Sequence, residues 1–539
     1  MDLFHRKKKK IKAQIRQSFG QPKTEDFNFD AIGRYADRNS RKSFQKLSGK
    51  TLSDLNFNDL FQYCDRTSSR IGQQVLYDHM QHIPENRDEI NTLEKWIERF
   101  ENNEPLRTDL QYHLRKLADN DAYYVCDLFQ RSFIRPPRWL PFAYVLGLTN
   151  LLALILLITN FNPVIMLVST AITVTNAVFH YLNKKNIYVY TYSMRQLLFL
   201  DHTVNYLWKF DFLKRESSVV PKSIEIFHII AGKTNFFRID DYMRGDPFYI
   251  LSTLSEIFKI YFLLEPIFLF RVFRQMKDHE KELQEVFAFT GKVDIALSIA
   301  SLRAGLPYFC KPEIIADIKK MHFEDIYIPL IPDCVSNTLN INNKSILITG
   351  SNMSGKTTFI RMVGINTLMA LTLNTSFARS FALPRLKLYS AILLNDDMMN
   401  DKSFYLEEVQ TIKEMIEVSR QKEPHLFLLD EIYKGTNTIE RVSGGKAVLS
   451  WLNRGNNLVF ISTHDIELTE LLKDEYDLYH FSEQVDNRNI SFDYKIKTGM
   501  MKTRNAIKIL EVNGYPPEII AEAKEISYEM DKQRSHFEK

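Results

Sequence analysis

The feature that most restricts the fold is a run of 43 residues, positions 140–182, that contains no Asp, Glu, Lys or Arg. A helix needs only about 20 apolar residues to cross a bilayer, so two crossings fit within the run. Asn160, Asn162 and Pro163 interrupt it near its middle, where a tight turn between two helices would lie. The run therefore predicts a two-helix hairpin.

Positive charge flanks this run on both sides. Arg135 and Arg138 precede it, and Lys184 and Lys185 follow it. Because positive residues favour the cytoplasmic side of a membrane, we expect both large flanking regions in the cytoplasm, next to the cytoplasmic membrane. The alternative is a hairpin buried within a soluble, cytoplasmic protein, and the polar residues of its second half keep that alternative open. Soluble core helices rarely remain uncharged for so long, so we favour the membrane hairpin.

The composition of the whole chain is that of a folded protein. Its 539 residues exceed what one hydrophobic core usually serves, which predicts two or more domains. Contents of 45% hydrophobic and 25% charged residues exclude wholesale disorder and a polytopic membrane protein. The net charge of +4 does not by itself indicate a nucleic-acid binder. The four cysteines are far apart and indicate neither a zinc site nor a disulfide framework.

A phosphate-binding loop is predicted where a short apolar strand meets a helix. Residues 345–349 have the pattern of a buried strand, and residues 350–357 match G-x-x-x-x-G-K-[ST]. In such a loop, backbone N–H groups and a helix N-terminus hold phosphate charge. We expect Lys356 to reach the β and γ phosphates of ATP, and Thr357 to ligate Mg²⁺. The expected nucleotide contacts are Gly350, Ser351, Asn352, Met353, Ser354, Gly355, Lys356, Thr357 and Thr358.

Carboxylates follow a second apolar strand further along the chain. Residues 426–429 directly precede Asp430 and Glu431, as expected for a buried parallel strand. Asp430 is the expected carboxylate of the magnesium site, and Glu431 is placed to polarise the attacking water. A third apolar strand ends just before His464, which we expect to sense the γ-phosphate, although a lone histidine is more often structural. These three elements in this order predict an ATPase.

The phosphate loop, GSNMSGKTT, resembles that of MutS proteins, because Asn352 and Met353 match the family beyond the general motif. The segments DEIYKGTNT, STHDIEL and NDDMMNDKSFYLEEV are similar to further family segments, and the last of them contains Ser403. In the family this serine faces the nucleotide of the opposite subunit. The resemblance therefore implies a homodimer with two composite ATP sites, to which Ser403, Glu431 and His464 contribute catalytic groups.

Fainter resemblance to the family core extends upstream, where Thr67, Gly72 and Asp294 match. The resemblance implies a multidomain α and α/β protein. Its expected parts are a basic N-terminal tail at residues 1–49, a helical core and lever region at 50–340 interrupted by the hairpin at 140–182, a P-loop α/β ATPase domain of the ABC type at 341–500, and a helical dimerisation segment at 501–539. The basic run at residues 6–10 is consistent with attraction to anionic lipid or nucleic acid, but we favour a solvated, frayed terminus.

The sequence also departs from the family pattern. Only about 50 residues precede the core-like segment, so we expect no mismatch-reading domain of the Phe-x-Glu type. Ser351, Phe404 and Tyr433 replace the family's proline, threonine and glycine, so nucleotide turnover is expected to differ from the family norm.

Three functions remain open at this point. The first is a membrane-anchored MutS-like ATPase, in which ATP binding and hydrolysis drive a conformational switch of the homodimer. The second is a soluble DNA-binding repair or recombination clamp with residues 140–182 buried, and the third is a nucleotide-gated membrane scaffold with little turnover. Besides ATP and Mg²⁺, the expected partners are a second copy of the chain, double-stranded or branched DNA, and membrane lipid around residues 140–182.

Overall fold

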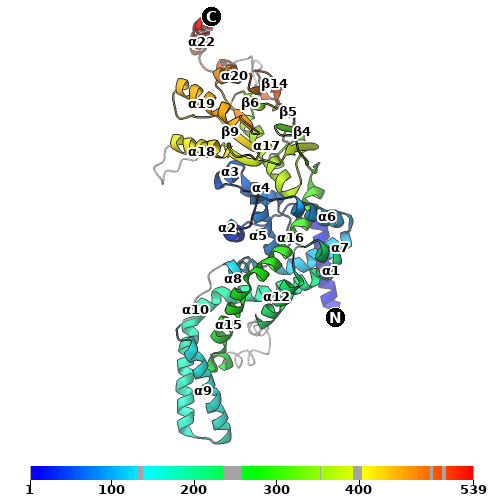
Figure 1. Cartoon of the computed structure of the whole chain (residues 1–539), viewed down its shortest axis with the longest axis vertical. Coiled ribbons are helices and arrows are strands. Elements are labelled where there is room, and N and C mark those ends of the chain that lie inside the picture. Colours follow the sequence, from blue (N-terminus) through cyan, green and yellow to red (C-terminus); the bar gives the residue numbers. More distant parts are fainter. Residues whose placement is uncertain are drawn as a thin grey trace. The chain divides into compact units, whose positions relative to one another are not determined.

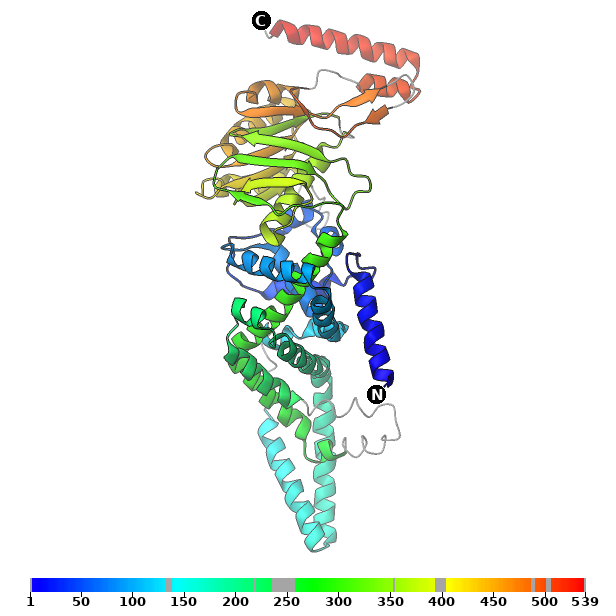
Figure 2. The same cartoon turned by 90° about the vertical axis from the view of Figure 1, so that its right-hand side faces the viewer.

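The chain folds into two compact units. The computed structural model describes residues 2–130, 138–217, 219–234, 257–351, 354–392, 404–485, 490–500 and 506–537. Unit 1 is helical, and unit 2 is built around β-sheets (Figures 1 and 2). Unit 1 comprises Met1–Lys42, Phe61–His79 and Asn86–Gly305, and unit 2 comprises Ser43–Leu60, Met80–Glu85 and Leu306–Lys539.

Unit 1 is organised around α16 (Glu280–Gly305), which is buried along most of its length. One of its neighbours is α6 (Asp88–Asn102), whose apolar residues recur at helical spacing and are buried from Ile90 to Phe100. The other helical elements of this unit are α1 (Asp2–Ser18), α2 (Phe29–Arg38), α5 (Arg70–Gln81), α7 (Glu104–Leu114), η1 (Arg115–Leu117), η2 (Asn120–Tyr124), α8 (Asp127–Gln130), α9 (Leu140–Thr159), α10 (Pro163–Leu207), α11 (Asp211–Glu216), α12 (Pro221–Lys233) and α15 (Leu264–Asp278).

The predicted helical hairpin is present as α9 and the first part of α10, with its turn where the sequence places it. Asn162 caps α10 by accepting a hydrogen bond from the backbone N–H of Val164, and Pro163 lies in the first turn. However, α10 does not end near residue 182 and continues to Leu207, because no Pro or Gly interrupts the sequence after Pro163. The hairpin projects from the rest of unit 1 (Figure 2).

Most of the hairpin surface is not covered by this chain. In the two stretches long and apolar enough to cross a membrane, Leu140–Thr159 and Pro163–Tyr181, only 22% and 17% of the most apolar window is buried. Large apolar side chains such as Leu152, Ile158 and Leu167 are exposed. Residues 140–182 are thus mostly exposed within the single chain, and both the membrane hairpin and the buried hairpin stay predictions.

Residues 2–49 contain regular structure, so the basic run at residues 6–10 is not frayed, although its side chains are exposed to solvent as expected. In α1, Ile15 is buried, and α2 buries an apolar face that includes Ile32 and Tyr35. The short strand β1 (Gln45–Lys46) pairs antiparallel with β2 (His82–Ile83). Burial of these apolar side chains holds the segment against the rest of the protein, although its first residues are strongly basic.

The main sheet of unit 2 has six strands in the order β14-β11-β6-β10-β9-β8. From β11 to β8 all neighbours are parallel, and β14 alone is antiparallel. The bounds are β6 (Ser345–Thr349), β8 (Lys387–Ala391), β9 (His425–Asp430), β10 (Leu458–Ser462), β11 (Tyr476–His480) and β14 (Lys497–Thr498).

Helices cover both faces of this sheet. Side chains of a strand alternate between the faces, so Phe427 and Leu429 join one core cluster, whereas Leu428 points toward Gly364 of α17 (Lys356–Leu373). The first cluster is completed by α18 (Phe404–Val418), α19 (Thr438–Leu452) and α20 (Ile466–Leu472). This arrangement is the α/β domain that the sequence predicts.

A second, four-stranded sheet in unit 2 has the order β3-β7-β4-β5. Its strands are β3 (Glu313–Ile315), β4 (Lys320–Ile326), β5 (Asn337–Asn342) and β7 (Ser380–Pro384). Pairing with β7 brings residues 306–340 into unit 2, although the sequence places them in the helical region. The predicted domain ranges otherwise stay predictions. Unit 2 also contains α3 (Gly49–Asp54), a β12–β13 ribbon (Glu483–Val485 and Ile490–Phe492), α21 (Ala506–Val512) and α22 (Pro517–Phe537), and α4 (Phe57–Cys64) lies across the division.

Candidate nucleotide site

The predicted phosphate loop joins the central strand β6 to the N-terminus of α17. Gly350 begins the loop with a φ of +142°, and a Cβ there would lie 2.7 Å from the carbonyl oxygen of Phe481. A side chain at this position would thus meet both backbone strain and a close contact. Ser354 is buried, and its hydroxyl donates to the carbonyl of Ser351.

Lys356, the first residue of α17, is buried beneath this loop. Its Nζ donates to the carbonyl oxygens of Gly350 at 2.8 Å and Ser351 at 2.9 Å, and lies 3.3 Å from Nε2 of His464. Burial lowers the pKa of Lys356 to about 8, against the opposing effect of Glu431 and Asp430. Among the described residues, no carboxylate lies within 4.0 Å of this ammonium group. It is therefore a buried cation without an ion-pair partner.

Thr357 and Asp430 meet at the carboxyl ends of β6 and β9. The Thr357 hydroxyl donates to Asp430 Oδ2 at 2.8 Å, and the hydroxyl of Ser462, at the end of β10, donates to Oδ1 of the same carboxylate. Hydroxyl and carboxylate oxygens are ligands that Mg²⁺ prefers. The predicted metal pair, Thr357 and Asp430, is thus brought together by the parallel sheet.

Glu431 and His464 form the other half of the site. Nε2 of His464 lies 2.7 Å from Glu431 Oε1, and Lys434 lies 3.4 Å from Oε2. The hydrogen bond with His464 is the main reason that the pKa of Glu431 falls to about 2. Glu431 also has a left-handed backbone with a φ of 56°, and its N–H donates to the carbonyl of Ser462. Its carboxylate is therefore ionised and held in place.

Two groups near the site were not predicted from the sequence. Glu408 of α18 is buried, accepts a hydrogen bond from the backbone N–H of Tyr433, and has its pKa raised by burial. Arg441 of α19 forms a two-pronged ion pair with Asp465, the residue after His464. The sequence signals were slight: Glu408 falls in helical register with the apolar residues Ile412 and Met415, and Asp465 only adjoins a predicted residue.

The remaining predicted residues differ in what the structure says of them. Thr358 is half-buried in the first turn of α17, and Ser351 donates through its hydroxyl to Glu483 at 3.0 Å. Asn352, Met353 and Ser403 lie outside the described residues. The structure thus brings together Lys356, Thr357, Asp430, Glu431 and His464, along with the described residues of the loop from Gly350 to Gly355.

The fold and this site define an α/β domain in which a glycine-bounded loop, a buried lysine and carboxylates at strand ends converge beside a central parallel strand. Residues 346–531 match the family model of MutS domain V. The chain is 29% identical, over 361 residues, to the DNA mismatch repair protein MutS of Thermotoga maritima. The aligned region covers 61% of this chain and 44% of that protein. The C-terminal part of the chain is therefore similar to the MutS family.

Other relatives give a similar picture. The DNA mismatch repair protein MutS of Clostridium kluyveri is 29% identical over 287 residues, with 49% of this chain and 32% of that protein covered. The protein of the same name from Aquifex pyrophilus is 26% identical over 285 residues, with 50% of this chain and 33% of that protein covered. The chain therefore spans less than half the length of these relatives.

Proposed function

We propose that this chain is an ATPase whose nucleotide-driven switch is anchored in a membrane by α9 and the first part of α10. The ATPase proposal rests mainly on one observation: Lys356, Thr357, Asp430 and Glu431 converge at the carboxyl ends of the parallel strands. Similarity to the MutS family supports the same activity.

The residues of the site fit ATP and Mg²⁺. Lys356 is a buried cation bonded only to carbonyl oxygens and His464, so a phosphate group would supply the negative charge that it lacks. Thr357 and Asp430 would hold Mg²⁺. When bound, the metal neutralises charge on the phosphate oxygens.

Glu431 is the group that we assign to water activation. Its low pKa makes it a poor proton acceptor but a permanent hydrogen-bond acceptor at neutral pH, which suits orientation of the attacking water. His464 holds the carboxylate of Glu431 and also contacts the ammonium group of Lys356. It therefore links the two groups, so that nucleotide binding beside one of them can affect the other.

We further propose that the chain works as a homodimer with composite sites, in which Ser403 of one copy faces the nucleotide of the other. The support is the similarity of residues 346–531 to MutS domain V and the resemblance of the segment around Ser403 to the family. ATP binding would close the dimer and hydrolysis would reopen it.

The membrane part of the proposal rests on the chemistry of the hairpin. Its outer surface is apolar, whereas its inner seam is polar: Asn150 and Asn176 both donate to the backbone carbonyl of Tyr261 at 2.8 Å, and Ser169 lies 2.6 Å from the Tyr261 hydroxyl. Side-chain hydrogen bonds between helices are a means of association inside lipid. With positive residues at both flanks, unit 2 would lie on the cytoplasmic side.

DNA is the proposed object of the switch, and the names of the relatives are the support for it. Double-stranded or branched DNA binding would depend on salt, because lysines and arginines that contact phosphates release counterions. Binding that changes with ATP in full-length protein and in a version without residues 140–182 would support this object. If neither version binds DNA, the proposed object of the switch is a membrane partner instead.

The test of the ATPase proposal compares wild type and Lys356→Ala in detergent. We expect wild type to bind and hydrolyse ATP in a Mg²⁺-dependent manner, and Lys356→Ala to do neither. Equal hydrolysis by the two proteins would refute the assignment of this site.

A further inference from the structure

Unit 1 contains a polar cavity of about 480 Å³ that the nucleotide site does not use. It lies between the end of α1, residues 21–25, residues 66–70, and the side of α7 and η1. Four cationic side chains line it, Lys23, Arg66, Arg70 and Arg115, but only one carboxylate, Glu25. The cavity is therefore lined by an excess of positive charge.

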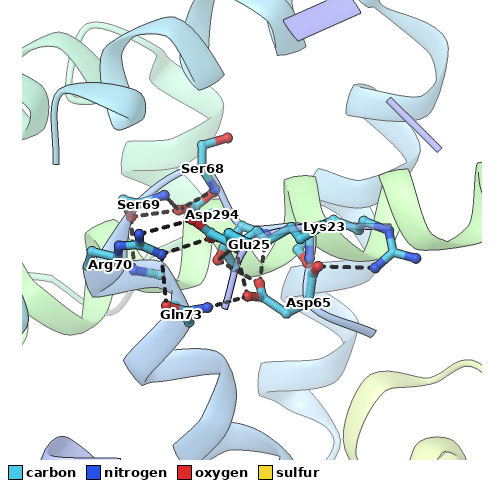
Figure 3. Close-up of polar contacts among 12 residues, drawn as sticks. Lys23, Glu25, Asp65, Ser68, Ser69, Arg70, Gln73 and Asp294 are labelled. Carbon is cyan, nitrogen blue, oxygen red and sulfur yellow. Dashed lines mark hydrogen bonds and ion pairs between the residues drawn. The ribbon is translucent and has the colours of Figure 1, made fainter. Parts of the chain in front are cut away.

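The wall of the cavity formed by residues 20–25 is fixed at several points. The backbone N–H of Gly20 donates to Ser301 Oγ at 2.9 Å, and Lys23 donates to Asp65 Oδ2 at 2.7 Å. Arg70 holds Glu25 through two hydrogen bonds of 2.8 and 3.0 Å. The segment after α1 is thus attached to the helical core through Lys23 and Glu25 (Figure 3).

The acidic groups close to the cavity already have internal partners. Asp294, which is fully buried, accepts hydrogen bonds from the backbone N–H groups of Ser68 and Ser69 and from the Ser69 hydroxyl (Figure 3). Asp65 accepts from Lys23, Gln73 and Thr67. The N-terminus of α5 is therefore occupied by Asp294, and within the described residues neither carboxylate lies within ion-pair distance of Arg66 or Arg115.

Among the four cations that line the cavity, Arg66 gives the strongest indication of an anionic ligand. Its side chain is almost completely enclosed, with the residue 8% exposed, and its guanidinium donates only to the backbone carbonyls of Tyr63 and Asp65. Its Nε is buried without a hydrogen-bond partner. Within the described part of the chain, no carboxylate lies within 4.0 Å of its guanidinium nitrogens. A buried arginine without an anion is costly, and an anionic ligand would remove that cost.

We propose that this cavity binds a small organic phosphate, with Arg66 and Arg115 as its cationic contacts. Guanidinium groups match phosphate oxygens in pairs, and the hydroxyls of Thr24 and Ser68 line the same space. The volume is within the range of small-molecule sites and exceeds what an inorganic phosphate would fill. The proposal is independent of ATP hydrolysis at Lys356.

The test measures binding of adenosine monophosphate to full-length Lys356→Ala protein by isothermal titration calorimetry, so that the loop at Gly350 contributes little. We expect saturable binding that Arg115→Gln and Arg66→Gln weaken by about tenfold or more each. The matched control is Lys116→Gln, which removes an exposed neighbouring cation that does not line the cavity. Because Arg115 is exposed, its substitution keeps the test valid even if Arg66→Gln fails to fold.

A second readout locates the ligand. Since α1 and residues 21–25 form part of the wall, bound ligand should slow tryptic cleavage within the basic start of α1, and Arg115→Gln should abolish this protection. Absence of saturable binding, or binding that Arg115→Gln and Lys116→Gln affect equally, would overturn the proposal. Binding of vesicles containing phosphatidic acid, without binding of the soluble probe, would also overturn it.

Discussion

The carboxylate of Asp294 occupies the space that a side chain on Gly72 would need: a Cβ at position 72 would lie 2.2 Å from Asp294 Oδ2. This contact joins α5 to α16 although 222 residues separate the two in sequence. Asp294 also caps the start of α5 through Ser68 and Ser69. The two faint sequence matches around Gly72 and Asp294 are thus the two halves of one packing contact.

Replacement of Gly72 by Ala should therefore destabilise unit 1. The added methyl group has to displace a buried carboxylate together with its hydrogen bonds, and overpacking of this kind costs about 1–3 kcal/mol. The measurement is thermal unfolding of detergent-purified protein. Gly232→Ala in α12 is the control, because its Cβ would meet no atom within 4 Å, and it should be neutral or stabilising. Equal unfolding temperatures for Gly72→Ala and wild type would contradict the packing contact.

Asp294 should give unit 1 a recognisable pH dependence. Burial raises its pKa to about 6, above the value of about 3.9 in an unfolded chain. The folded state therefore binds the proton more tightly, so the stabilisation is present below pH 4 and is lost as the pH rises toward 6. Compared with Asp294→Asn, wild type should lose on the order of 2 kcal/mol between these pH values. A difference between the two proteins that does not change with pH would refute the raised pKa.

Much of the candidate nucleotide site was predictable because its residues follow strands and loops in a fixed order. Asp430 ends β9, His464 follows β10, and Lys356 follows the loop after β6; parallel pairing brings these strand ends together. The cavity in unit 1 was not predictable. Its contacts join Lys23 to Asp65 and Ser68 to Asp294, and no local pattern encodes such distant pairs. The continuation of α10 to Leu207 was missed because the hydropathy changes there while the helix does not end.

Glu431→Gln should retain ATP binding and lose hydrolysis. The amide keeps the shape of the side chain but removes the negative charge that orients water, so the rate should fall by about 100-fold or more. Steady-state phosphate release and filter binding of ATP measure the two quantities. Glu470→Gln, an exposed position on α20, is the matched control and should behave as wild type. Comparable rates for wild type and Glu431→Gln would instead favour a nucleotide-gated scaffold.

His464→Asn should move the acidic limb of the pH–rate profile to higher pH. The hydrogen bond with His464 is the main cause that lowers the pKa of Glu431 to about 2, so its loss should raise that pKa and let Glu431 become protonated at less acidic pH. His322→Asn, which changes a partly exposed histidine on β4, should leave the limb in place. A profile for His464→Asn that is only lower, with the same limb, would show that His464 does not set the charge of Glu431.

The hairpin should lose lipid association when charge is placed on its outer face. Leu152 and Leu167 are exposed on α9 and α10, and an arginine near the centre of a spanning helix costs about 2.5–3.5 kcal/mol on insertion scales. We expect the double substitution Leu152→Arg and Leu167→Arg to reduce flotation with liposomes. The control places the same two arginines at Lys209 and Lys214, which lie beyond the spanning stretches and already carry positive charge.

The most direct test of a membrane-anchored ATPase is the ATP hydrolysis rate of the lipid fraction after full-length protein is reconstituted and floated on a density gradient. The proposal predicts that hydrolysis rises with the liposomes and is absent when Lys356→Ala protein is floated in the same way. Hydrolysis that stays with protein at the bottom of the gradient, or that is equal for wild type and Lys356→Ala in the floated fraction, would contradict it.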